Sequence, residues 1–263
     1  MSRHAPQVER RPKEKPMDQN GMGERIAVVS GGSSGIGKAF VAELRGRGYT
    51  VVTCARDPAK LGQLQTEYPG VECHAVDVSD AAAMRDFARK VLVAHPAIDL
   101  LVSNAGGLRQ VDFTSEALQN QDLTADIRSN LDGAIHLVGG FVPGLRRSAK
   151  ASIIIISSGY ALAPATRAPI YSASKAALHS LSKSLRRQLA PLNITVTEVA
   201  PPAVDTPSTA HRKVPKMAAR DVVAEALAAA SRGVKEVYPG GARWLPLLLR
   251  IAPSWMEERV ARR

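Results

Sequence analysis

Strand-like apolar runs and helix-like segments alternate along most of this chain of 263 residues. The apolar runs lie at 26–30, 50–55, 71–76, 98–103, 152–157, 194–199 and 235–238, and the helical segments lie at 35–47, 59–67, 80–95, 119–147, 169–190 and 218–231. This alternation favours parallel strands, because each crossover between them needs a connection that is usually a helix. The sequence therefore predicts an α/β fold with a doubly wound, mostly parallel, seven-stranded sheet and helices on both faces.

The two ends of the chain differ in composition from the α/β region, which we place at residues 25–240. Residues 1–24 are rich in charge and proline, so we expect a disordered extension there. They lack the apolar stretch of a secretory signal, and no apolar run approaches the length of about 18 residues typical of a membrane span. We therefore expect a cytoplasmic protein. Residues 241–263 are apolar and basic, which predicts a lid, an interface or a packing helix, with peripheral membrane contact as a further role.

A glycine-rich loop, Gly31-Gly32-Ser33-Ser34-Gly35-Ile36-Gly37, joins the first strand-like run to the first helical segment. Glycine permits a tight turn and a close approach of backbone to phosphate, and a helix N-terminus offers free N–H groups. The loop thus favours a dinucleotide site, although its spacing differs from the common G-x-G-x-x-G and such loops also serve as plain connections. The absence of a G-K-[ST] ending disfavours a P-loop NTPase.

Arg56 follows the second strand-like run, where a carboxylate usually binds the ribose of NAD. A guanidinium matches a phosphate instead, so Arg56 favours the 2′-phosphate of NADP, with Ser33 as a further donor. Asp57, one residue later, leaves NAD open as a cofactor. The alternative for Arg56 is a solvated loop residue.

Tyr171 and Lys175 lie four residues apart on a predicted helix and so project from one face. A lysine ammonium near a phenol favours the phenolate, which predicts a lowered pKa for Tyr171. Such a tyrosine exchanges a proton with a carbonyl or alcohol oxygen, and the Ser158 hydroxyl is placed to bond the same oxygen. This is acid–base chemistry on a carbonyl, and it becomes a redox reaction with a hydride donor beside it.

These motifs, together with Asn104-Ala105-Gly106, resemble the short-chain dehydrogenase/reductase family in its short, single-domain branch, over about residues 25–240. The resemblance implies a Rossmann-type fold with Tyr171 as the general acid and base. It implies that Lys175 lowers the pKa of this tyrosine and holds the nicotinamide ribose, and that Ser158 orients the carbonyl. Asn130 is implied to fix a water molecule that relays protons to Lys175.

The same resemblance implies a cofactor site whose residues are spread over much of the sequence. Its expected residues are Gly31, Ser33, Ser34, Gly35, Ile36, Gly37, Arg56, Asp77, Val78, Asn104, Ala105, Gly106, Tyr171, Lys175, Pro201, Val204 and Thr206. One position departs from the family pattern P-G-x-V-x-T, because Pro202 replaces the glycine. Proline fixes φ and has no N–H, so the turn is expected to be stiffer. Residues 203–218 are the expected lid.

The remaining composition excludes several other functions. The net charge is +11, but the basic residues are dispersed and aromatic residues make up only 4% of the chain, so no nucleic-acid partner is expected. Cys54 and Cys73 are interpreted as buried, reduced core residues. The six histidines show no ligand spacing, so no metal site is predicted. A leucine stripe is expected in the core or in a homodimer or homotetramer interface, and it comprises Leu178, Leu181, Leu185 and Leu189.

The predicted function is an NADPH-dependent carbonyl reductase or alcohol dehydrogenase. It would transfer a hydride between the nicotinamide and a ketone or secondary alcohol, preferably a hydrophobic or long-chain one. A non-catalytic NADPH-sensing protein is the alternative, although a sensor has no need of a proton donor. A dehydratase or epimerase of nucleotide sugars uses the same Tyr-x-x-x-Lys pair, but such relatives usually carry a longer substrate domain.

Overall fold

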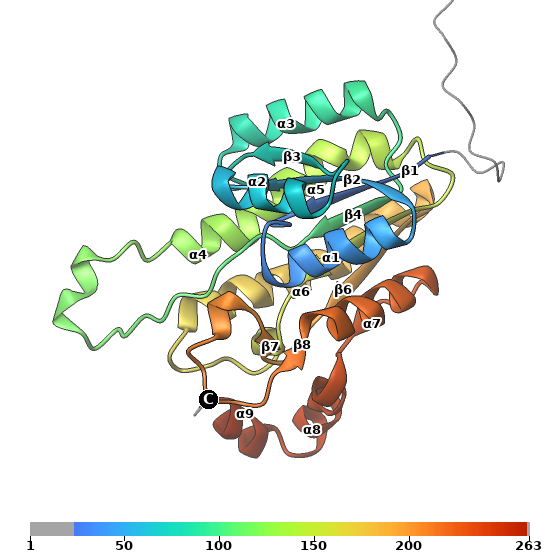
Figure 1. Cartoon of the computed structure of the whole chain (residues 1–263). Helices are drawn as coiled ribbons and strands as arrows, with labels where there is room; N and C mark the ends of the chain where they lie inside the picture. Colours follow the sequence, from blue (N-terminus) through green and yellow to red (C-terminus); the bar gives the residue numbers. More distant parts are fainter. Residues whose placement is uncertain (1–23, 262–263) are drawn as a thin grey trace, which may run out of the picture.

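A seven-stranded sheet forms the centre of the computed structural model, which describes residues 24–261 (Figure 1). Its strand order is β3-β2-β1-β4-β5-β6-β9, and every neighbouring pair is parallel. The bounds are β1 Arg25–Ser30, β2 Tyr49–Ala55, β3 Glu72–Ala75, β4 Leu100–Ser103, β5 Ala151–Ile156, β6 Ile194–Val199 and β9 Glu236–Val237. The order steps outward from β1 in both directions, so the predicted doubly wound α/β fold is confirmed.

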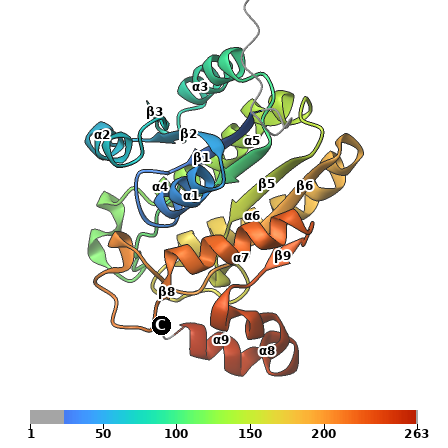
Figure 2. The ribbon, with the colours of Figure 1, turned by 45° about the vertical axis from the view of Figure 1, so that its right-hand side comes forward.

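Helices cover both faces of this sheet (Figure 2). One face packs against α3 (Ala81–Ala94), α5 (Gly133–Leu145) and α6 (Pro169–Leu189). The opposite face packs against α1 (Gly35–Gly46), α2 (Pro58–Glu67) and α7 (Ala219–Ser231). Each layer buries its own apolar cluster, so the sheet is covered by hydrophobic side chains on both faces.

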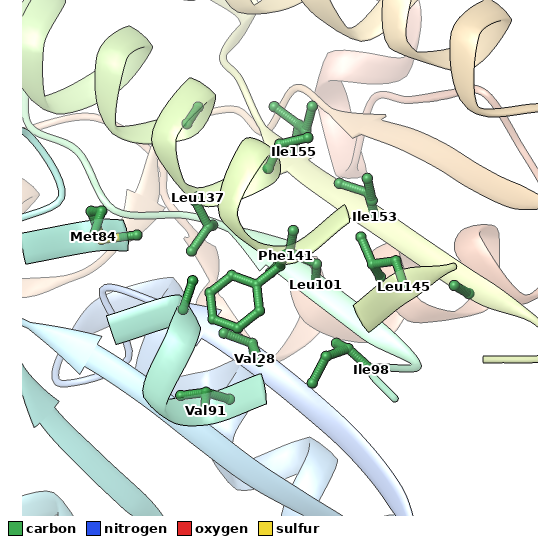
Figure 3. Close-up of a cluster of buried hydrophobic side chains, with 14 of the residues drawn as sticks. Val28, Met84, Val91, Ile98, Leu101, Leu137, Phe141, Leu145, Ile153 and Ile155 are labelled. Carbon is green, nitrogen blue, oxygen red and sulfur yellow. The ribbon is translucent and has the colours of Figure 1, made fainter. Parts of the chain in front are cut away.

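The isoleucine run of β5 shows why the sheet is buried on both faces. Successive side chains of a strand point to opposite faces. Ile153 and Ile155 therefore enter the cluster beneath α5, where they lie near Phe141 (Figure 3), whereas Ile154 and Ile156 enter the cluster beneath α7. The edge strand β3 is less covered, so Cys73 is half-buried rather than buried as predicted, while Cys54 in β2 is buried. Both thiols are free.

The helix predicted at 119–147 is shorter and interrupted. A 3-10 turn covers Glu116–Asn120, and α4 (Ala125–Ile127) leads through a π-helical turn, Arg128–Asp132, into α5. Before α4 the side chains of Asp112 and Ser115 accept hydrogen bonds from nearby backbone N–H groups. Such local bonds compete with helix formation, and this segment reaches away from the body of the molecule (Figure 1).

The C-terminal part of the chain lies beyond the carboxyl ends of the strands (Figure 1). β7 (Val204–Asp205) pairs with β8 (Met217–Ala218) across the expected lid. The following α8 (Leu245–Ile251) and α9 (Pro253–Ala261) pack against the segment after β5, through Leu245, Val260 and Ala163. The leucine stripe of α6 packs in the core. None of the helices within residues 24–261 is long and apolar enough to span a membrane.

Candidate active site

The predicted site residues follow the carboxyl ends of the six strands β1 to β6. Parallel strands bring these ends to one edge of the sheet, which is where ligands bind in open α/β folds. The glycine loop follows β1, Arg56 follows β2 and Asp77 comes two residues after β3. The others follow β4, β5 and β6 or lie on the helices behind them: Asn104, Ala105, Gly106, Asn130, Ser158, Tyr171, Lys175, Pro201, Val204 and Thr206.

The glycine loop has no room for side chains. A Cβ atom on Gly37 would lie 2.1 Å from the carbonyl oxygen of Gly31, and Gly31 itself has a φ of 72°. Ser34 stands at the N-cap of α1 without a side-chain hydrogen bond to the helix, so the first N–H groups of α1 are uncapped. The loop therefore presents bare backbone and a helix N-terminus, which fit a phosphate.

Two further segments close around this loop. Asn104 Nδ2 donates to the carbonyl oxygens of Ser30 and Gly31 at 3.0 and 3.3 Å, which ties the end of β4 to the loop. On the other side, a Cβ on Gly35 would lie 3.1 Å from Thr206 Cγ2. The segment after β6 thus meets the glycine loop. Pro202 comes shortly before Thr206 in this segment. The carbonyl oxygen of the next residue, Ala203, accepts a hydrogen bond of 2.9 Å from Met217 N.

Arg56 and Asp57 have different roles in the structure. Asp57 caps α2 by accepting from Ala59 N at 3.0 Å and Lys60 N at 3.2 Å, and these bonds hold its pKa below the ordinary value. Arg56 is exposed beside Asp77. Burial acts to raise the pKa of Asp77, but hydrogen bonds from Ser79 and the charge of Arg56 lower it overall. The carboxylate of Asp57 is thus already engaged, whereas Arg56 faces solvent.

Ser158, Tyr171 and Lys175 converge after β5. Ser158 caps a 3-10 turn, Gly159–Ala161, by accepting from Tyr160 N at 3.2 Å, and its hydroxyl is near enough to Tyr171 to act toward a lower pKa of that phenol. Lys175 Nζ lies 5.5 Å from the centre of the Tyr171 ring, one turn along α6, and donates to Ile156 O at 3.0 Å. The lysine is only 5% exposed. The three groups predicted to act on one oxygen are therefore adjacent.

Burial dominates the protonation of this pair, contrary to the predicted lowering at Tyr171. It raises the pKa of Tyr171 to about 12, although the bond from Ser158 acts in the opposite direction. It also lowers the pKa of Lys175 to about 8, against the attraction of Asp126 and Glu198. Desolvation disfavours both charged forms, so the neutral phenol is the resting state of Tyr171 in the protein alone.

Asn130 lies in the π-helical turn and is 1% exposed. Its amide nitrogen donates to Gly107 O at 3.1 Å and to Ser174 Oγ at 2.9 Å, and its amide oxygen accepts from Gly107 N at 2.9 Å. Ser174 Oγ donates in turn to Tyr171 O at 2.7 Å. The side chain thus joins the end of β4 to α6, and both of its polar atoms are already hydrogen-bonded within the protein.

Asp126 lies in the same region, but it was not among the site residues predicted from the sequence. It is 4% exposed and accepts from Arg109 N at 2.9 Å. Its negative charge acts to raise the pKa of both Tyr171 and Lys175, and at Lys175 burial outweighs this effect. The spacing of four residues from Asn130 was the available signal, because it places both on one helical face.

A buried polar cluster behind Lys175 was also missed. His179 Nδ1 lies 2.8 Å from Glu198 Oε2, and the nearby Glu236 completes a set of three with metal-ligand atoms within 4.8 Å of one another. Arg186 pairs with both carboxylates, at 3.7 and 3.0 Å, and Ser157 Oγ donates to Glu198 at 2.6 Å. A single guanidinium thus pairs with both carboxylates, so protein side chains already hold this cluster together.

The geometry described above coincides with a match to known proteins. The family model described as short chain dehydrogenase matches residues 25–216. The chain belongs to the short-chain dehydrogenase/reductase family. It is an NAD(P)-dependent oxidoreductase with a Rossmann fold. An uncharacterized oxidoreductase of Bacillus subtilis (strain 168), DltE, is 35% identical over 188 residues, which are 70% of this chain and 73% of that protein.

Other similar proteins agree with this assignment. The uncharacterized oxidoreductase SERP2049 of Staphylococcus epidermidis is 31% identical over 188 residues, 71% of this chain and 80% of its own length. A crystal structure of a short chain dehydrogenase from Burkholderia cenocepacia J2315 in complex with NADP has a TM-score of 0.80 at 28% identity, over 90% of this chain and 97% of that one. A Burkholderia phymatum member in complex with NAD has a TM-score of 0.76 at 22% identity, over 90% and 95% of the two chains, and shows the fold alone.

Proposed function

We propose that this short-chain dehydrogenase/reductase reduces a ketone with NADPH. The observation that carries the proposal is the convergence of Ser158, Tyr171 and Lys175 at the sheet edge that also holds the glycine loop. The contact between Gly35 and Thr206 brings the segment after β6 to the same place. A proton donor therefore stands beside a site whose bare backbone suits a dinucleotide.

The bound nicotinamide supplies a hydride to the carbonyl carbon. The residues of the chain act on the oxygen, where negative charge grows as the carbonyl is reduced. Ser158 donates a hydrogen bond to that oxygen, and the neutral phenol of Tyr171 transfers its proton to it. Lys175 then stabilises the phenolate by its charge. Asn130, as the family resemblance implies, would hold the water through which a proton returns to Lys175 and Tyr171.

Arg56 supports NADP over NAD as the preferred cofactor. Its guanidinium is exposed, whereas the only nearby acid that follows β2, Asp57, is used as a helix cap. A guanidinium in this position suits a 2′-phosphate. The Burkholderia cenocepacia relative was crystallised with NADP, which agrees with this preference, although the more distant NAD complex shows that the fold accepts both.

The other expectations from the sequence stay proposals. The substrate is proposed to have an apolar part, because α8 and α9 place Leu162, Leu245 and Leu249 in a cluster beside the site. A cytoplasmic homodimer or homotetramer fits a chain of this family. The exposed Trp244 and Trp255 near Arg250 and Arg259 keep a peripheral membrane contact of the C-terminal helices as a proposal.

Replacing the proton donor tests the proposed reaction. Tyr171→Phe should lower kcat for NADPH oxidation by about 10²- to 10⁴-fold over a panel of ketones, because general acid catalysis contributes that much. NADPH binding, measured by its fluorescence, should persist. Wild-type turnover in the variant would remove Tyr171 from its role. A wild-type protein that binds NADPH but reduces no ketone would favour the sensor function.

A further inference from the structure

One side of the Arg167 guanidinium, next to the active site, makes no hydrogen bond. It lies just before α6, two residues ahead of Pro169 and four ahead of Tyr171. Its Nε and Nη2 atoms are buried and have no hydrogen-bond partner within residues 24–261. These two nitrogens form one side of the guanidinium plane, and that side donates two parallel hydrogen bonds when arginine binds a carboxylate or phosphate.

A second arginine converges on the same place. Arg212, from the expected lid, donates through Nη2 to the Tyr160 hydroxyl at 3.0 Å. Arg167 also acts on this hydroxyl, and the two guanidinium groups together lower the pKa of Tyr160 against the opposing effect of burial. Neither arginine forms an ion pair in the part of the chain that the structure describes. Two positive charges thus meet at one neutral oxygen.

This arginine pair, Arg167 and Arg212, lies close to the proton donor. The Tyr160 ring stands edge-on to the Tyr171 ring, with 6.2 Å between ring centres. The charge of Arg212 is near enough to lower the pKa of Tyr171, while burial raises it. A group held by the arginine pair would therefore belong to the same small molecule as a carbonyl held by Tyr171.

Leaving buried N–H groups of a charged side chain unpaired is costly, so such groups usually mark a binding site or a missing partner. We propose that Arg167 and Arg212, with the hydroxyl of Tyr160, bind an anionic oxygen group of the substrate, which is a carboxylate or a phosphate on the ketone. This inference rests on the proposed function. It makes the substrate a keto acid or a keto phosphate whose apolar part lies against the neighbouring leucines.

Two loops meet at the arginine pair, and the free edge of Arg167 is buried. Val111 N donates to Arg167 O at 3.1 Å, and Arg212 is carried by the segment between β7 and β8. Binding thus requires one of these loops to shift. Asp126 opposes an anion here by its charge on Tyr171, so the arginine pair must outweigh it.

Matched ketones test this proposal in the full chain with NADPH. The acids run from 2-oxobutanoate to 6-oxoheptanoate, each beside its methyl ester, and dihydroxyacetone phosphate is compared with dihydroxyacetone. Wild type should prefer at least one anionic member over its neutral partner by about 10- to 100-fold in kcat/KM, the range expected for charged hydrogen bonds. Arg167→Gln should bring that ratio toward one through a higher KM for the anion.

Two further variants identify the cause of any loss. Arg167→Lys keeps the charge without the paired donors, so it should recover only part of the preference. Arg187→Gln, at the exposed C-terminal end of α6, should keep the wild-type ratio. Equal rates for anionic and neutral partners in wild type, or an unchanged ratio in Arg167→Gln, would overturn the proposal.

A binding measurement separates this inference from the proposed reaction. Butanoate or inorganic phosphate should raise the thermal midpoint of wild type over chloride at equal ionic strength, and the rise should vanish in Arg167→Gln. This result would support the anion site even if no ketone is reduced. Reduction of neutral ketones without any anion effect would support the reaction and reject the site.

Discussion

Tyr171 and Lys175 lie one helical turn apart on α6, and both side chains leave water when the chain folds. Their spacing predicts mutual stabilisation of a phenolate and an ammonium. Burial has the larger effect and favours the neutral form of both groups. For ketone reduction this state is useful, because the phenol must hold its proton until charge grows on the substrate oxygen.

The lowered pKa of Lys175 predicts a pH-dependent stability. Between its folded pKa of about 8 and its ordinary value of 10.5, the unfolded chain holds a proton that the folded chain releases. Stability should therefore rise with pH in this window, by at most about 1.4 kcal/mol per unit. Lys175→Met should flatten the rise, measured by urea unfolding of the protein without cofactor.

The raised pKa of Tyr171 acts at higher pH and with the opposite sign. Above pH 10 the unfolded tyrosine loses its proton while the folded one keeps it up to about 12, so stability falls there. Lys183→Met, on the exposed face of α6, is the matched control for Lys175→Met, because it removes a lysine charge that is not buried. An identical slope below pH 10 in wild type and Lys175→Met would contradict the burial argument.

Arg56 makes a separate prediction about the cofactor. Arg56→Ala should raise the Kd for NADPH by about 10- to 100-fold and change that for NADH little, since only NADPH carries the 2′-phosphate. Fluorescence titration with both nucleotides measures the two constants. Arg232→Ala, an exposed arginine at the end of α7, should leave both unchanged. Equal losses for the two nucleotides would place Arg56 away from the phosphate.

At the scale of elements, the site depends on irregular backbone. The π-helical turn at Arg128–Asp132 places Asn130 between the end of β4 and α6. Such turns often occur at functional sites, because they leave backbone groups without helical partners. The glycine loop is a second irregular element, whose shape depends on the missing side chain at Gly37.

Two glycines at opposite ends of α1 test this dependence. In Gly37→Ala the new Cβ would meet Gly31 O at 2.1 Å, so the loop must shift and NADPH binding should be largely lost. Overpacking of this kind typically costs about 1–3 kcal/mol. Gly46→Ala has nothing within 4 Å and should stabilise the helix slightly, by up to about 1 kcal/mol. Thermal unfolding and NADPH fluorescence measure both variants, and intact binding in Gly37→Ala would contradict this account.

At the scale of the whole molecule, the last two helices return to the site. α8 and α9 form a small apolar cluster with the segment that carries Tyr160, and Leu245 touches Gly159. The C-terminal segment, for which the sequence left a lid, an interface or a packing helix as alternatives, packs here against the segment after β5. It therefore supports the loop that follows Ser158, which the proposed function assigns to the substrate.

Truncating this contact should affect substrate more than cofactor. Leu245→Ala removes a side chain that is 7% exposed and should destabilise the protein by about 2–3 kcal/mol, with a higher KM for the ketone. The Kd for NADPH should stay near that of wild type. Leu247→Ala, on the same helix but 46% exposed, is the control and should change neither. An equal effect on NADPH and ketone would mean that α8 supports the whole fold rather than the substrate side.

Local sequence patterns were enough to predict the sheet and the positions of the residues that follow its strands. A strand whose side chains are buried alternately on its two faces can be recognised from neighbouring residues alone, as in the isoleucines of β5. Because parallel strands end at the same edge of the sheet, the residues that follow them then lie close together. Local patterns did not determine what depends on contacts between distant segments. Three features depend on side chains that only folding brings together: the raised pKa of Tyr171, the position of the Arg167 guanidinium beside Tyr160, and the polar cluster around Glu198. The sequence could not predict them, because desolvation and charge act through space and not along the chain.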